Sequence, residues 1–164
     1  MIQCQSLVLI VFIALPCFAQ EQSQSNATCP VTIGSDHGLG DPFPKSENWY
    51  GSESLAVILP AEGRWGITGP NARIAVKLFI WSVGFYSGME QDLTVEVQSL
   101  IGGPNDVVVK DVTHALDSSW ENGAMLAGID FPSPGCWKLT LEYLGQSLSF
   151  VVETVDWANA DTAT

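Results

Sequence analysis

Residues 131–155 contain two stretches in which apolar and polar side chains alternate, separated by a short turn around Gly145. The apolar positions are Trp137, Leu139, Leu141 and Tyr143 in the first stretch, and Leu148, Phe150 and Val152 in the second. A period of two is typical of a strand with one buried face, and two such strands around a tight turn form a hairpin. This segment therefore predicts an antiparallel β-hairpin whose apolar face lies against a core.

Short stretches of the same kind recur along the rest of the chain. The strands that we expect cover residues 31–33, 55–59, 74–81, 93–98, 107–112, 125–131, 137–143 and 147–155. Turn residues separate most of them, and no window of twelve residues carries a helical stripe. The pattern predicts an all-β protein, either an antiparallel β-sandwich of about seven to nine strands or a small barrel.

The first 19 residues resemble an export signal. They contain no charged side chain, and residues 7–15 form an apolar run that is followed by Pro16, Cys17 and, two residues later, the small Ala19. The run is too short for a membrane-spanning helix, which needs about 20 residues. We expect a cleaved signal peptide over residues 1–19 and a secreted or periplasmic location. A lipoprotein signal at Cys17 and a buried N-terminal helix of a cytosolic protein are the alternatives.

The chain that remains after cleavage is long enough for one domain with a substantial core. Residues 20–28 are polar and lack hydrophobic periodicity, so a disordered lead-in is expected there. A frayed tail is expected over residues 158–164, which are small and polar. A single β-sandwich domain then occupies residues 29–157, and no segment is expected to span a membrane.

All 18 acidic and all six basic residues follow the signal, and the formal net charge is −12. An acidic surface repels phosphate groups, which excludes nucleic acid as a partner and disfavours an anionic membrane surface. Solubility outside the cytosol accounts for the acidity without a special cationic partner.

Four cysteines are present, of which Cys4 and Cys17 belong to the signal. The remaining two, Cys29 and Cys136, are expected to form a disulfide in an oxidising compartment. Two free thiols are the alternative. Strict alternation places Cys136 on the outward face of its strand, so either a bulge at residues 134–135 re-aims it or the disulfide lies at the edge of the sandwich.

Two motifs carry a resemblance to known proteins. They are Cys29-Pro30-Val31-Thr32 and the later run Phe131-Pro132-x-x-Gly135-Cys136-Trp137-x-Leu139-Thr140, which continues to Gly145 and Leu148-Ser149-Phe150-Val151-Val152. Together they resemble a group of uncharacterised secreted bacterial proteins. The second run is also similar to the last hairpin of many immunoglobulin-like sandwiches. The resemblance implies an immunoglobulin-like fold and a secreted location, and it implies no activity.

Residues suited to catalysis or metal binding are sparse. The two histidines, His37 and His114, stand in no recognisable motif, and residues 145–149 approach a nucleophile elbow but lack its last glycine. Asp36 and Asp41 flank the glycine-rich segment around His37 without matching a metal-binding loop. We therefore expect no enzyme activity, metal or cofactor.

Aromatic residues are the better candidates for binding. If Ile74, Leu78 and their alternating neighbours face the core, Trp81 faces outward. The candidate binding residues are Trp49, Tyr50, Trp81, Phe85 and Tyr86. Such rings stack on sugars or anchor protein partners, and ordinary core packing is the alternative. The sequence predicts a secreted non-catalytic domain that binds a protein, a glycan or an envelope component; the alternative is a metal-binding protein or hydrolase with an unrecognised site.

Overall fold

The computed structural model describes residues 28–35, 48–67, 74–86, 92–102, 106–115 and 123–156. The expected signal peptide, the tail and all of the lead-in except Thr28 lie outside the described residues. So do Asp36, His37 and Asp41.

The described part of the chain is all-β, as the sequence predicts. Its strands are β1 (Trp49–Gly51), β2 (Ala56–Ile58), β3 (Arg64–Ile67), β4 (Ile74–Trp81), β5 (Thr94–Ser99), β6 (Val108–Val109), β7 (Thr113–Ala115), β8 (Ala124–Phe131), β9 (Gly135–Tyr143) and β10 (Gln146–Asp156). One 3-10 turn, η1 (Ala61–Gly63), precedes β3. These ten strands exceed the seven to nine expected, chiefly because β1 and β3 are too short to show alternation.

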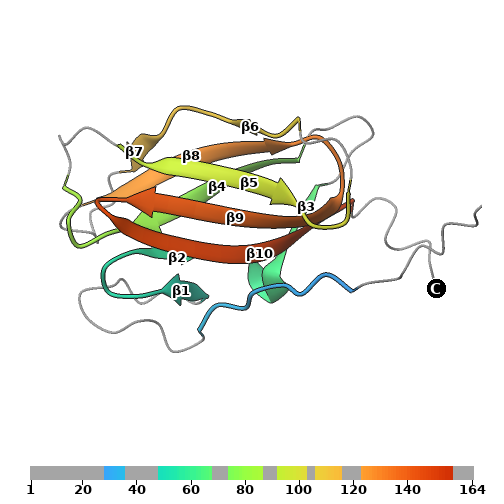
Figure 1. Cartoon of the computed structure of the whole chain (residues 1–164), viewed down its shortest axis with the longest axis horizontal. Coiled ribbons are helices and arrows are strands. Elements are labelled where there is room, and N and C mark those ends of the chain that lie inside the picture. The colour runs from blue at the N-terminus through green and yellow to red at the C-terminus, as the bar shows by residue number, and fades with distance from the viewer. Residues whose placement is uncertain are drawn as a thin grey trace, which may run out of the picture.

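The strands form two sheets that lie face to face (Figure 1). The larger sheet has the order β1-β2-β4-β8-β6, with β7 also paired to β8, and the smaller has the order β3-β10-β9-β5. Every strand pair is antiparallel except β3 with β10, which is parallel. The architecture is therefore the expected β-sandwich with one parallel pair at the edge of the smaller sheet.

Apolar side chains from both sheets meet in one core. Its buried members are Leu55, Val57, Leu59, Ile74, Leu78, Ile80, Phe85, Leu93, Met125, Ala127, Ile129, Phe131, Trp137, Leu139, Leu141, Tyr143, Phe150 and Val152. The predicted inward face of the β9–β10 hairpin supplies six of these residues, and Leu148 packs against them while partly buried. The period of two thus identified the core side of the hairpin correctly.

The hairpin closes with a two-residue turn, Leu144-Gly145. Both residues have positive φ, 46° at Leu144 and 75° at Gly145. This backbone shape matches the twist of the two strands, and asparagine, aspartate or glycine usually occupies it because a branched or bulky side chain is crowded there. Leu144 therefore occupies a position that disfavours leucine.

Residues 28–35 run along one side of the sandwich and touch both sheets (Figure 1). The Thr32 amide donates to the Val151 carbonyl at 2.8 Å, and the Val151 amide donates to Thr32 Oγ1 at 2.9 Å. Farther on, the Ser35 amide donates to the Trp49 carbonyl at 2.7 Å. The strand predicted at residues 31–33 is absent, because a side-chain oxygen replaces the backbone carbonyl that a ladder requires.

Candidate functional site

The Cys29–Cys136 disulfide is present, with a Cα–Cα distance of 5.6 Å, and lies at one end of the sandwich. The register of β9 with β10 is continuous from Gly135 to Tyr143, and Cys136 is paired with Glu153, so no bulge re-aims it. Cys136 keeps the outward position that alternation gives it and is nevertheless buried. The disulfide therefore fastens residues 28–35 to the outer face of the smaller sheet, outside the main core.

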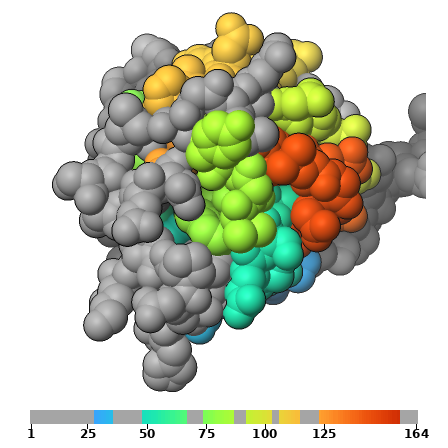
Figure 2. All heavy atoms as spheres, turned by 90° about the vertical axis from the view of Figure 1, so that its left-hand side faces the viewer, coloured from blue at the N-terminus to red at the C-terminus, as the bar shows by residue number. Residues whose placement is uncertain are grey.

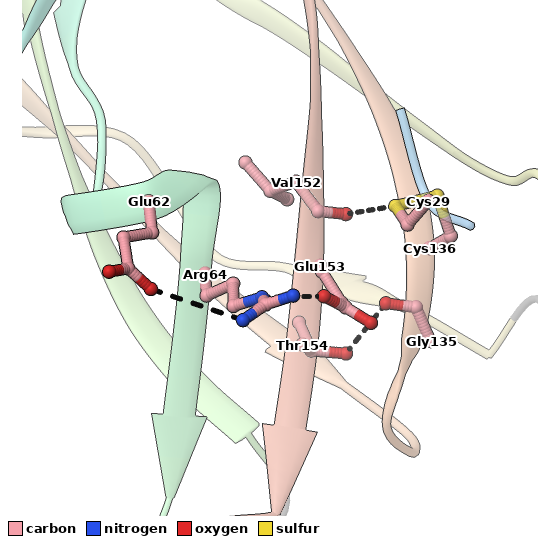
Figure 3. Close-up of polar contacts among 8 residues, drawn as sticks. All are labelled: Cys29, Glu62, Arg64, Gly135, Cys136, Val152, Glu153 and Thr154. Carbon is pink, nitrogen blue, oxygen red and sulfur yellow. Dashed lines mark hydrogen bonds and ion pairs between the residues drawn. A yellow bond between two sulfur atoms is a disulfide. The ribbon is translucent and has the colours of Figure 1, made fainter. Parts of the chain in front are cut away.

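Polar contacts surround the disulfide (Figure 3). Arg64 Nε lies 2.8 Å from a carboxylate oxygen of Glu153, and its Nη1 lies 3.9 Å from Glu62. Nearby, Trp137 Nε1 donates to Thr154 Oγ1 at 2.9 Å, and that hydroxyl donates to the Ser133 carbonyl at 3.1 Å. A hollow of ≈ 620 Å³ borders this region. The polar groups at the centre of this disulfide region already pair with one another within the chain. We therefore interpret the region as a structural junction and not as a binding site.

Three of the five aromatic candidates are buried, so the expectation that they form an exposed binding surface is wrong for them. Trp49, Trp81 and Phe85 have exposed fractions of 1%, 4% and 1%. Trp81 does point away from the main core, as alternation predicts, but it packs with Trp49 and Ala56 in a second small cluster. Alternation reports the side of a sheet to which a residue points, and it carries no information about what covers that side.

The other two candidates differ from each other. Tyr50 is half-buried, packs edge-on against Phe150 at 6.3 Å between ring centroids, and donates to the Ser149 carbonyl at 3.3 Å. Tyr86 is 59% exposed. Tyr86 is therefore the one member of the predicted set that offers most of its ring to a partner.

Two exposed aliphatic residues accompany Tyr86 at the end of the sandwich opposite the disulfide. Val83 is 65% and Leu144 58% exposed. The Leu144 side chain reaches over Gly84, where an added Cβ would lie only 2.6 Å from Leu144 Cδ1. In Figure 2 the segment that ends at residue 86, in lime, lies beside the β9–β10 turn, in orange-red. We call Val83, Tyr86 and Leu144, together with the hollow beside them, the turn-end surface.

That hollow has a volume of ≈ 400 Å³ and an acidic lining. The residues that line it are Asp92, Thr94, Glu142, Tyr143, Leu144, Gly145, Gln146 and Ser147. Asp92 and Glu142 are exposed, and none of the lining residues is basic. Tyr143 differs from both, because its side chain is buried and packs edge-on against Phe85.

The Tyr143 hydroxyl is buried and has no hydrogen-bond partner in the part of the chain that the structure describes. Burial raises the pKa of Tyr143 above its ordinary value of 10.0, and Asp92 and Tyr86 raise it further. Burial and the Asp92 carboxylate therefore both favour the neutral form of the phenol. Buried polar groups are paired in the great majority of cases, so the hydroxyl of this lining residue is an exception to the rule.

Tyr143→Phe tests the state of this hydroxyl. At about pH 7 the free energy of unfolding should stay the same or rise by up to about 1 kcal/mol, because no internal hydrogen bond is lost. Burial and Asp92 disfavour the phenolate, so the folded-state pKa lies above the unfolded one of about 10.0; ionisation leaves stability unchanged well below pH 10 and destabilises the folded wild type as the pH rises through the folded-state pKa. The variant should therefore gain relative stability above about pH 10. Denaturant titrations at both pH values measure this, and a loss above about 1 kcal/mol at neutral pH would show that the hydroxyl is paired.

Sequence reasoning missed Val83 and Leu144 because both lie in turns, where the alternation of apolar and polar residues does not predict exposure. A detectable signal existed for Leu144, which precedes Gly145 in the short hairpin turn, where asparagine or aspartate is usual. His114 lies on β7 and is exposed.

Within the described ranges, no three His, Cys, Asp or Glu side chains gather as a metal site would require. The same ranges contain no helix with the length and apolar character needed to cross a bilayer. Comparison with known proteins finds no matching family model, no matching curated protein and no matching solved structure. The surface of this chain is therefore the remaining guide to its function.

Proposed function

We propose that this protein is a secreted or periplasmic, non-catalytic β-sandwich that binds a protein, a glycan or an envelope component through the turn-end surface. We further propose that it belongs with the uncharacterised secreted bacterial proteins that its two cysteine motifs resemble. The single observation that carries the binding function is Leu144, an exposed leucine in a positive-φ turn position, whose side chain lies against Gly84 in the segment that carries the exposed Val83 and Tyr86.

Leu144 is unfavourable for the stability of the fold in two respects. A leucine with positive φ is destabilised by roughly 1–2 kcal/mol relative to its normal conformation, and asparagine tolerates the same shape far better. A leucine that is 58% exposed also recovers only part of the free energy of burial. Sequences that violate a local rule without compensation inside the fold do so most often at functional sites. Contact with a partner supplies the missing burial.

The disulfide supports the extracytoplasmic location. Cys29 and Cys136 are paired in this fold, and disulfides of this kind persist in oxidising compartments and are rare in the cytosol. The net charge of −12 agrees with a soluble protein in such a compartment.

The binding function is tested with Leu144→Asn, because asparagine removes the aliphatic side chain and suits the turn. The variant should be as stable as the wild type or about 1 kcal/mol more stable. Ligands selected on the wild-type protein from a displayed peptide library, and hits from a glycan array, should bind the variant at least about tenfold more weakly, as expected when a central contact is removed.

Ile101→Asn is the matched control. Ile101 is 59% exposed and Leu144 is 58% exposed, so the two side chains are equally accessible. Ile101, however, lies beside the disulfide, at the end of the sandwich opposite the turn-end surface. Selected ligands should bind this variant as they bind the wild type. Equal binding to all three proteins, or no selected ligand in either screen, would contradict the proposed function.

A further inference from the structure

The charges of the turn-end surface have one sign. Asp92 and Glu142 line its hollow, and the lining contains no lysine or arginine. Elsewhere two basic side chains of the described residues are neutralised within the chain, Arg64 by Glu153 and Lys110 by Asp130, both at contact distance. The two carboxylates of the hollow have no such neutralising partner in the described residues. A cationic group is the complementary occupant.

The exposed aromatic ring of Tyr86 favours the same occupant. Tyr86 is exposed, and Tyr86 and Asp92 both lie close enough to Tyr143 to raise the pKa of its phenol. An aromatic face attracts an ammonium or guanidinium group, and a nearby carboxylate strengthens that attraction. Tyr143, whose buried hydroxyl has no hydrogen-bond partner among the described residues, is one of the residues that line the same hollow.

The aliphatic part of the surface distinguishes a protein from a glycan. Sugars stack on broad aromatic rings, and Trp49 and Trp81, the rings best suited to stacking in the predicted set, are buried. Val83 and Leu144 instead offer exposed branched methyl groups, which pack against aliphatic side chains. The surface therefore combines an aliphatic contact area with an acidic hollow.

From this combination we infer that the turn-end surface binds a segment of a partner protein in which a lysine or arginine is flanked by aliphatic side chains. The cationic group lies between Asp92 and Glu142 beside the Tyr86 ring, and the aliphatic neighbours pack on Val83 and Leu144. This partner assignment rests on the binding function proposed above. A second copy of the chain fits less well, because a net charge of −12 on each copy opposes association.

The experiment uses two blocked tripeptides as probes, acetyl-Leu-Arg-Leu-amide and its counterpart with citrulline in place of arginine. Citrulline has nearly the shape of arginine and no charge, so the pair isolates the contribution of the cation. Each is titrated into the isotope-labelled protein, and amide shifts are followed by NMR. The arginine peptide should shift the signals of Tyr86, Asp92 and Leu144 and bind at least about fivefold more tightly than the citrulline peptide, with an advantage that shrinks as salt is added.

The variant Asp92→Asn/Glu142→Gln should remove this advantage. The matched control is Asp106→Asn/Asp111→Asn, which removes two exposed carboxylates that do not line the hollow. Its net charge equals that of the Asp92→Asn/Glu142→Gln variant. The control should bind both peptides as the wild type does. If both double variants lower the affinity equally, overall charge and not this hollow attracts the peptide, and the inference is wrong.

The remaining outcomes separate this inference from the proposed function. Equal affinity for the two peptides, with both weakened by Leu144→Asn, would overturn the cationic partner and leave the binding function standing. A glycan hit that Leu144→Asn abolishes would have the same meaning. A dimer in sedimentation that Leu144→Asn dissociates would replace the partner with a second copy. Absence of shifts at the turn-end surface, together with selected ligands that ignore Leu144→Asn, would overturn both.

Discussion

Replacement of both cysteines, Cys29→Ala/Cys136→Ala, is expected to lower the free energy of unfolding by about 4 kcal/mol. The two residues are 107 positions apart in the sequence, so the disulfide closes a long loop and restricts the unfolded chain strongly. Cys136 is also buried, and its replacement removes packing against the residues that cover it. Denaturant titration of the wild type and the double variant measures the loss.

A reducing agent supplies the control for this experiment. Reduced wild type should approach the double variant in stability, whereas the double variant should not respond to the reductant. The contacts of residues 28–35 should weaken along with the disulfide, because Thr32 holds this segment to Val151 through only two hydrogen bonds. A double variant within about 1 kcal/mol of the wild type would show that residues 28–35 and Cys136 stay packed without the covalent link.

The long strands could be predicted from the sequence because their alternation is complete. Ile74, Leu78 and Ile80 of β4 enter the core, as do the four apolar residues of β9. Trp81 shows the limit of this reasoning. Its direction followed from alternation, but its burial depends on Trp49 and Ala56, which belong to other strands and approach it only in the folded sheet.

The short edge strands could not be predicted, because partners define them. The β3 sequence, Arg-Trp-Gly-Ile, shows no useful period, and it becomes a strand by pairing in parallel with the end of β10. The disulfide illustrates the opposite case. Cysteine counting identified the pair, and alternation gave the outward direction of Cys136. The bulge considered at residues 134–135 is absent. The disulfide does not require it, because residues 28–35 bring Cys29 to the outer face of the sheet, where Cys136 already points.

The turn-end surface was the least predictable part of the molecule. Its members come from the turn after β4, the segment before β5 and the β9–β10 turn. The register of β5 with β9 and the packing of the two sheets on each other bring these segments together. Of the predicted binding residues it retains Tyr86 alone. The polarity of the hollow depends on Asp92 and Glu142, which are 50 positions apart and gave no motif.

Trp137→Ala is the second change with a large expected effect, a loss of about 3–5 kcal/mol in the free energy of unfolding. Trp137 is buried, lies 5.3 Å from Phe131 between ring centroids, and donates its indole N–H to Thr154 Oγ1. Truncation to alanine therefore creates a cavity and also leaves the buried Thr154 Oγ1 without its hydrogen-bond donor. The two contributions are separable, because Trp137→Phe keeps most of the ring volume and Thr154→Val keeps the shape of the threonine.

A double-mutant cycle of Trp137→Phe and Thr154→Val measures the hydrogen bond alone. The coupling free energy should be about 1 kcal/mol, since each single change leaves one buried polar group without its partner and the double change leaves neither. Thr154→Val also removes the bond to the Ser133 carbonyl, but that contribution is common to both sides of the cycle and cancels. Coupling near zero would show that the indole N–H is satisfied elsewhere, and Trp137 would then stabilise the disulfide end of the sandwich by packing alone.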